Sequence, residues 1–210
     1  MMRGIRFLLS LLLVLGMPAA ALASHFIPME RVFVKIPDTS SKVVQKDFSE
    51  GERKMHFLGG RSSNGSPVLL TVRKGHFLEP DSSLWHNVLN DSVSRSRRIT
   101  YSITQFKDTD TGRFFYGITP GVSGIDWLFN TMLIGYDREG KKVHEFINSR
   151  NFYAPHGVDI DAFKTHRGNL YLAKYEFGRF QDGTVYRLIW NPEKDWFGYE
   201  EVSPGEVKGL

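Results

Sequence analysis

The chain has 210 residues, of which 41% are hydrophobic, 13% aromatic and 24% charged, and it contains no cysteine. This composition supplies enough core-forming side chains to exclude a wholly disordered, collagen-like or coiled-coil protein. The formal net charge of +4 falls to +2 without the two arginines of an N-terminal leader, and a nearly neutral domain is not typical of a nucleic-acid-binding protein. Without cysteine, disulfides, thiol nucleophiles and thiolate metal sites are excluded.

The first 23 residues have the features of a secretory signal peptide. Arg3 and Arg6 form a basic region, residues 7–15 form a short apolar run, and residues 21–23 (Ala-Leu-Ala) supply the small residues that signal peptidase requires. The apolar run is much shorter than the roughly 20 residues of a membrane-spanning helix, so we expect cleavage before Ser24 and no transmembrane span. A cysteine-free exported domain fits a bacterial periplasm or the cell exterior, and it cannot be lipid-anchored through an N-terminal cysteine.

Residues 24–210 are expected to form a single β-rich domain. Short runs of β-branched and aromatic residues alternate with clusters of Gly, Asp, Asn and Ser, which is the pattern of strands joined by turns. The ends, residues 24–30 and 193–210, lack periodicity and are expected to be loosely ordered. The predicted strands are 32–36, 54–58, 68–72, 98–106, 113–118, 132–136, 143–147, 169–175 and 184–190.

Segment 98–106 is the clearest of these strands. Ile99, Tyr101 and Ile103 alternate with threonine and serine, so one face should meet a core and the other should meet water. Several neighbouring strands are expected to pair as hairpins, because turn-forming residues separate them. The predicted turns are 59–67, 108–112, 137–140 and a segment that ends at 181–183.

One segment departs from the strand pattern and predicts a helix from about residue 82 to residue 94. Leu84, Trp85 and Val88 recur at helical spacing behind a capping Asp or Ser. Segment 124–133 is compatible with a short helix or with a strand. The expected fold is therefore mainly β, an antiparallel sandwich- or barrel-like sheet with one short α-helix near residues 82–94.

A string of residues in the second half resembles one blade of the NHL-type β-propellers. It comprises residues 135–146 (GYDREGKKVHEF), 154–159 (APHGVD) and 168–173 (GNLYLA). A complete propeller needs at least four blades of roughly 40 residues, and residues 24–110 show no second copy. A small β-propeller therefore stays the alternative fold.

The sequence carries no strong catalytic or cofactor signature. The nearest approach to a serine-hydrolase elbow, residues 121–125, has its second glycine one position early. His144-Glu145 lacks the second histidine of a zinc-protease helix, and no glycine-rich phosphate loop follows a predicted strand. We expect neither a cofactor nor a metal.

Three groups of residues are candidate sites. His156, Asp159, Asp161 and His166 could bind a zinc-like ion or supply a general base, although two aspartates that share the solvent face of a strand explain the pattern more simply. A basic patch could meet an anionic surface, and a group of aromatic residues outside the periodic strands could stack on a ligand. The basic patch is Arg95, Arg97 and Arg98, and the aromatic group is Trp196, Phe197 and Tyr199.

These observations favour an exported, non-catalytic module that binds an unknown ligand or an envelope protein. The alternatives are a periplasmic hydrolase that uses histidine and carboxylate residues, and a structural component of the envelope. A histidine in a cleft within hydrogen-bonding reach of a carboxylate would favour the enzyme, and an open aromatic or apolar patch would favour the binding module.

Overall fold

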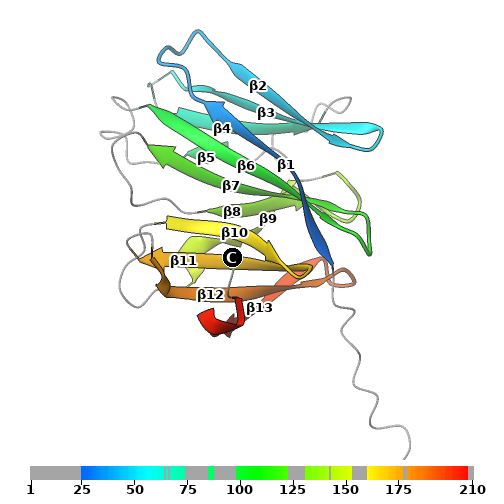
Figure 1. The fold of residues 1–210 in the computed structure, drawn as a ribbon. Helices are drawn as coiled ribbons and strands as arrows, with labels where there is room; N and C mark the ends of the chain where they lie inside the picture. Colours follow the sequence, from blue (N-terminus) through cyan, green and yellow to red (C-terminus); the bar gives the residue numbers. More distant parts are fainter. Residues whose placement is uncertain are drawn as a thin grey trace, which may run out of the picture.

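The computed structural model describes residues 25–63, 65, 67–73, 85–87, 98–122, 131–141, 143–152, 160–176 and 179–207. Three antiparallel sheets account for most of them (Figure 1). The N-terminal sheet has the strand order β2-β3-β4-β5, the central sheet β1-β6-β7-β8-β9 and the C-terminal sheet β10-β11-β12-β13.

The strands are bounded as follows. The N-terminal sheet contains β2 (Val44–Glu50), β3 (Arg53–Arg61), β4 (Pro67–Arg73) and β5 (Trp85–Asn87). The central sheet contains β1 (Phe26–Lys35), β6 (Ile99–Asp108), β7 (Phe114–Val122), β8 (Met132–Tyr136) and β9 (Val143–Asn148). The C-terminal sheet contains β10 (Ile160–His166), β11 (Asn169–Glu176), β12 (Arg179–Asn191) and β13 (Trp196–Val202). Two short 3₁₀ helices, η2 (Ser149–Asn151) and η3 (Pro204–Val207), complete the described elements.

The predicted mainly β fold is confirmed. Each of the nine predicted strands overlaps a strand in the structure, and β8 spans the predicted residues 132–136. The sequence analysis missed β2, β5, β10 and β13. None of the described helices is long and apolar enough to cross a membrane.

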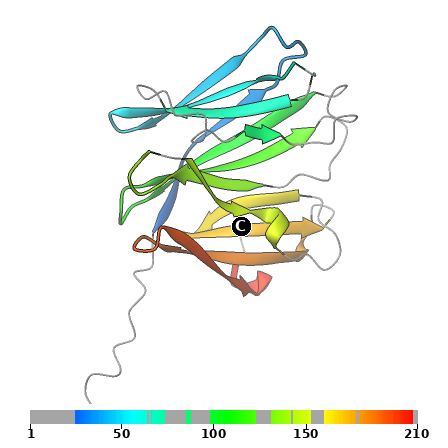
Figure 2. The ribbon, with the colours of Figure 1, turned by 180° about the vertical axis from the view of Figure 1, so that it is seen from behind.

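The central sheet lies between the other two, so that both of its faces are buried over much of their area (Figures 1 and 2). Consecutive residues of β7 show this arrangement, because Tyr116 packs with Phe48 and Phe57 of the N-terminal sheet, whereas Phe115 packs with Trp190 of the C-terminal sheet. Side chains of a strand alternate between faces, and here each face meets a separate core. The architecture is sandwich-like, with three layers.

The described strands form neither a barrel nor a closed ring of propeller blades. The string that resembles a single blade is divided between two layers, because residues 135–146 contribute to β8 and β9 of the central sheet and residues 168–173 contribute to β11 of the C-terminal sheet. Its remaining part, residues 154–159, lies outside the described residues.

The long strand β1 contributes to both cores. Phe26 packs in the core between the central and C-terminal sheets, and Val34 packs in the core between the central and N-terminal sheets. In the pairing with β6, Pro28 lies opposite Phe106 and Arg31 lies opposite Thr104, so β1 holds one extra residue between these positions. Such a bulge reverses which face the following residues occupy.

The start of β1 is fixed to the turn between β10 and β11. The Phe26 N–H donates to the carbonyl oxygen of Gly168 at 2.7 Å. Gly168 has φ +79°, and a Cβ atom on it would lie 2.1 Å from Nδ1 of His25. A glycine is therefore required here both by the backbone conformation and by the close approach of His25.

The predicted helix is wrong for Trp85–Asn87, which pair with Val68–Leu70 as β5. Helical spacing is a local signal, and the open edge of β4 offers backbone hydrogen bonds that override it. The other residues of the predicted helix lie outside the described residues. In the ambiguous segment 124–133, Met132 and Leu133 belong to β8, and residues 124–130 are not described.

The ends of the domain are also more regular than predicted. Residues 26–30 belong to β1, and residues 196–207 form β13 and η3. Val207 of η3 is buried against Tyr171, Ala173 and Val185 on the outer face of the C-terminal sheet. These segments are ordered by contacts with other strands, which a local sequence pattern does not record.

Candidate functional site: a groove between two edge strands

A groove opens between the central and C-terminal sheets. It has a volume of about 530 Å³ and is lined by residues of β1, β6, β7 and β10. This size is within the range of pockets that hold small ligands or a short stretch of peptide.

The groove runs along two strand edges. Four consecutive residues of β10, Ala162–Thr165, and four consecutive residues of β1, Pro28–Arg31, line it. Because side chains alternate between the faces of a strand, four residues in a row can line a hollow only when the hollow follows the edge of the strand. Both strands are the outermost members of their sheets.

The floor of the groove carries hydroxyl groups from the central sheet. Ser102 and Thr104 of β6 and Thr119 of β7 line it and are half-buried. Their neighbours Tyr101 and Ile103 are fully buried in the opposite core. This arrangement confirms the alternation predicted for segment 98–106, and the polar face proves to be the groove floor.

One end of the groove is apolar and closely packed. Phe163 of β10 lies against Gly117 of β7, where a Cβ atom would come within 2.8 Å of the Phe163 ring and 3.0 Å of the Phe106 ring. Gly117 thus allows the C-terminal sheet to approach the central sheet at this point. The two phenylalanine rings give the groove an apolar base beside its hydroxyl groups.

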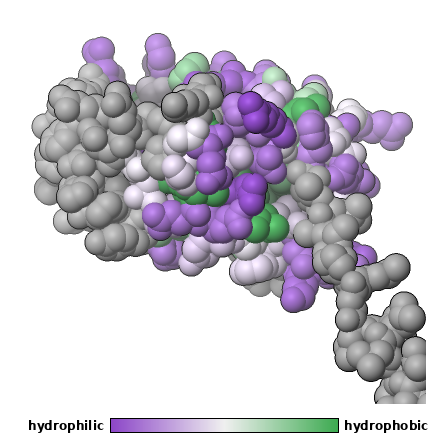
Figure 3. All heavy atoms as spheres, turned by 60° about the horizontal axis from the view of Figure 1, so that its bottom comes forward, coloured by the Kyte–Doolittle hydropathy of each residue, from purple (hydrophilic) through white to green (hydrophobic). Residues whose placement is uncertain are grey.

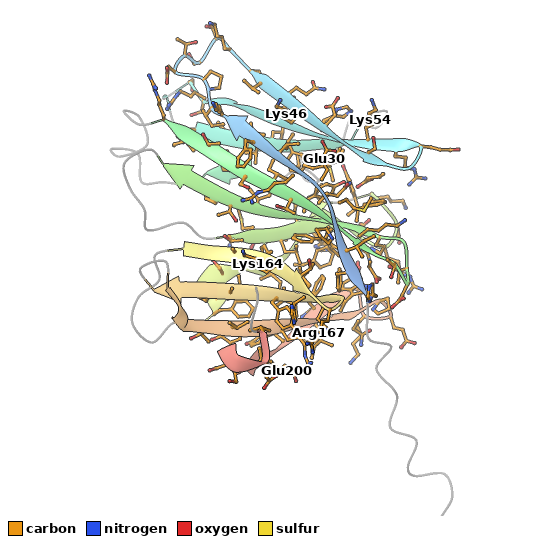
Figure 4. All side chains as sticks on the ribbon, viewed as in Figure 1. Glu30, Lys46, Lys54, Lys164, Arg167 and Glu200 are labelled. Atoms are coloured by element: carbon orange, nitrogen blue, oxygen red, sulfur yellow. The ribbon has the colours of Figure 1, made fainter. Side chains whose placement is uncertain are left out.

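Arg31 is the best-positioned charged residue of the groove. Its Nε–H donates to Oγ of Ser102 at 2.8 Å, and its guanidinium carbon lies 5.3 Å from the centre of the Phe33 ring, which is 54% exposed. No described residue pairs with the Nη groups of Arg31. Glu30 on β1 and Lys164 on β10 also line the groove and are labelled in Figure 4.

The predicted His/Asp cluster does not form a compact site in the described part of the chain. Asp161 pairs with Lys174 and His166 pairs with Asn169 in the β10–β11 register, so the two residues lie five positions apart on one strand. This separation corresponds to roughly 16 Å along the strand. His156 and Asp159 lie outside the described residues, among which no group of three or more His, Asp or Glu side chains could hold a metal ion.

The predicted aromatic group is divided. Phe197 is only 1% exposed and belongs to the core, so its prediction as a binding aromatic is wrong. Its position in β13 points it inward, opposite Trp190 of β12. Trp196 and Tyr199 are 56% and 55% exposed, but they lie three residues apart on a strand and therefore on opposite faces. Figure 3 brings the C-terminal sheet, at the bottom of Figure 1, toward the viewer. On this face hydrophobic residues form small separate areas among hydrophilic ones.

Of the predicted basic patch, only Arg98 is described. It is exposed directly before β6. Arg95 and Arg97 lie outside the described residues, so the patch stays a prediction.

Sequence analysis missed a histidine–carboxylate pair on the N-terminal sheet. The Nδ1–H of His56 donates to Oδ1 of Asp47 at 2.6 Å, and the Gln45 side-chain amide donates to the same oxygen at 2.8 Å. His56 is 9% exposed, and its Nε2 is buried without a hydrogen-bond partner. The hydrogen bond from His56 is the main reason why the pKa of Asp47 is lowered. Only the β2–β3 register brings these residues together, and β2 was not predicted.

A second hollow, of about 420 Å³, lies among the turns that follow β2, β6 and β8. Its most buried cation is Arg113, whose guanidinium bonds to the Asp195 carboxylate and to the carbonyl oxygen of Tyr136. The guanidinium carbon also lies 4.8 Å from the centre of the Trp190 ring. These contacts hold the central sheet to the C-terminal sheet, so we assign Arg113 a structural role.

Comparisons with known proteins identify no family or relative, so the function is argued from the geometry of the site alone. No model of a protein family matches the chain, and comparisons with curated proteins and with solved structures find no match either.

Proposed function

We propose that this chain is an exported module of a bacterial cell envelope that binds a ligand or partner, without catalysis, in the groove between β1 and β10. The single observation that carries the proposal is that one hollow is bordered by two strand edges that pair with no described strand. Export rests on the predicted leader, residues 1–23, with Ser24 as the first residue of the mature chain.

The chemistry of the groove suits binding. Hydroxyl groups of Ser102, Thr104 and Thr119 offer hydrogen bonds, Phe106 and Phe163 offer apolar contact, and Arg31 offers charged donors. Binding sites in proteins typically combine a mainly apolar surface with a few oriented polar groups. No described histidine, the most common general base, lines the groove.

The absence of cysteine permits a direct test in the groove. A single-cysteine variant, Thr104→Cys, is alkylated with a maleimide in buffer and in an extract of the host cell envelope. We expect the extract to slow alkylation about tenfold or more, because at saturation the thiol reacts only when the ligand has dissociated. The matched control is Thr39→Cys, in an exposed turn outside the groove. Equal slowing of both variants, or of neither, would contradict the proposal.

A hydrolase ranks second, because His56 pairs with the Asp47 carboxylate but lines neither hollow, and its Nε2 is buried. A carboxylate that accepts from Nδ1–H leaves the lone pair on Nε2, which is the form of imidazole that accepts a proton from a nucleophile. The test is hydrolysis of p-nitrophenyl esters and phosphates by the wild type, by His56→Gln and by the exposed control His144→Gln. Turnover that only His56→Gln abolishes would support the hydrolase, and our leading proposal expects no turnover by the wild type.

A further inference from the structure

The edge of β10 that pairs with no described strand has the properties of a docking site for another strand. All seven residues of β10 pair with β11 in a continuous register with no bulge, and the segment IDAFKTH contains neither proline nor glycine. Along the unpaired edge of an antiparallel strand, every second residue presents its N–H and C=O groups outward. These groups are a ready template for an incoming strand.

The other described edges are less suited to this role. On β1, Pro28 lacks an N–H group and the bulge that follows interrupts the register. On β9, the extra residue Phe146 interrupts the register with β8, and on the N-terminal sheet β5 has only three residues. The edges of β2 and β13 are regular, but neither strand contributes to the groove. The edge of β10 thus combines regular geometry with a hollow that follows it along Ala162–Thr165.

We propose that the groove binds an extended acidic peptide segment of a partner protein, which adds to the edge of β10 as an antiparallel strand. This inference rests on the proposed function of the groove and names the class of its partner. Strand addition takes its affinity from main-chain hydrogen bonds and its specificity from the side chains that alternate along the bound segment.

The preference for an acidic segment follows from the charges of the groove. Arg31 and Lys164 oppose the single carboxylate of Glu30 among the residues that line it. The bond to Ser102 and the contact with Phe33 hold the Arg31 guanidinium in place, while its Nη groups have no partner among the described residues. A guanidinium fork held in this way matches the two oxygens of an Asp or Glu side chain.

The apolar end of the groove sets a second preference. Phe106 and Phe163 lie beside the hydroxyl groups of Ser102 and Thr104. A bound strand would direct every second side chain to this surface, where a β-branched residue meets both ring and hydroxyl. The expected motif therefore alternates Val or Thr with other residues and carries one carboxylate within reach of Arg31.

Fluorescent peptides with the length of β10, seven residues, provide the test. One set alternates Val and Thr around a central Glu, and a matched set has Lys in its place. Fluorescence polarisation should show tighter binding of the acidic set to the wild type. In Arg31→Glu we expect acidic peptides to bind about tenfold or more weakly, because a charge-assisted pair becomes a repulsion. The control Lys46→Glu reverses an exposed charge on the N-terminal sheet (Figure 4) and should bind like the wild type.

Backbone methylation distinguishes strand addition from simple charge attraction. Methylation of the alternate amides that face β10 removes the interstrand donors and should abolish binding, whereas methylation of the other set should be tolerated. Equal effects of the two methylated sets, or equal binding of the acidic and basic peptides, would overturn the proposal. The proposal would also be overturned if the chain formed a dimer that the peptides dissociate, because the occupant of the groove would then be a second copy of the chain.

The result for Thr104→Cys separates this inference from the function on which it rests. If an envelope extract protects Thr104→Cys but no peptide set binds, the groove takes a ligand other than a peptide strand, so the inference fails and the proposed function stands. If the extract protects neither cysteine and no peptide binds, both fail.

Discussion

Phe26 and Val34 are eight residues apart on β1, a spacing that would place them on one face of a regular strand, and yet they pack in opposite cores. The extra residue between Pro28 and Arg31 explains this relationship, because it moves the later side chains of β1 to the opposite face of the sheet. The same bulge lies on the wall of the groove. The bulge thus allows β1 to contribute to both cores, and it also forms part of the candidate site.

Deletion of Glu30 is expected to destabilise the protein strongly. With the bulge removed, either Phe26 or Val34 must leave its core, and the loss should resemble that of truncating a buried large side chain, about 3 to 5 kcal/mol. Urea unfolding measures the change. Deletion of Ser41, in the exposed connection between β1 and β2, is the matched control and should cost less than about 1 kcal/mol. Similar losses of stability from the two deletions would show that the bulge does not determine which face of the sheet the side chains of β1 occupy.

The Arg113–Asp195 contact is expected to contribute measurably to stability. Both side chains are largely buried, at 19% and 22% exposure, and Arg113 also lies over the rings of Phe115, Phe146 and Trp190. Arg113→Ala should cost about 2 to 3 kcal/mol, and Arg113→Lys should rescue little because the planar fork is lost.

The matched control for this prediction is the ion pair of Lys141 with Glu139, which joins side chains that are 75% and 67% exposed. Exposed pairs contribute little, so Lys141→Ala should leave the unfolding midpoint unchanged. A double-mutant cycle of Arg113→Ala with Asp195→Ala should give a coupling near 1 kcal/mol. A coupling of zero would contradict the role of this contact.

Gly168→Ala is expected to loosen the start of β1. The substitution strains a backbone at φ +79° and displaces His25, which would weaken the hydrogen bond from the Phe26 N–H to Gly168. We expect a loss of about 1 to 2 kcal/mol and faster amide exchange at Phe26. Gly112→Ala is the control, because Gly112 has a similar φ of +73° and no atom within 4 Å of an added Cβ. If both variants lose the same stability, His25 plays no part.

Stability is expected to fall as the pH rises above 10. Burial raises the pKa of Tyr101 above its ordinary value of 10, so the unfolded chain loses this proton first. The stabilisation is fully present below pH 10 and declines by about 1.4 kcal/mol per pH unit between the unfolded and folded pKa values. Tyr101→Phe should make the decline shallower but leave part of it, because burial and the Glu50 carboxylate also raise the pKa of Tyr116. An unchanged slope in Tyr101→Phe would contradict this assignment.

Sequence patterns predicted the strands whose signals are local. The alternation of Ile99, Tyr101 and Ile103 identified β6, and turn residues marked the hairpins around residues 112 and 140. In contrast, β5 carries a helical spacing and pairs with the edge of β4. β13 lacks alternation because Trp196 is exposed on one face while Tyr199 is exposed on the other.

The groove could not be predicted from the sequence, and the reason is physical. Its lining residues come from four strands between residues 28 and 165, and no local pattern records which edges meet. The polar face of 98–106 was a true signal, because Ser102 and Thr104 form the groove floor. The His56–Asp47 pair depends in the same way on the β2–β3 register.

Amide hydrogen exchange along β10 tests the central claim most directly. With the acidic peptide bound, every second amide of β10 should gain protection, in the alternating pattern of a newly paired edge, while the equally regular edge of β2 stays unchanged. Protection confined to β2, or no change along β10 at a peptide concentration that saturates the polarisation signal, would contradict the account.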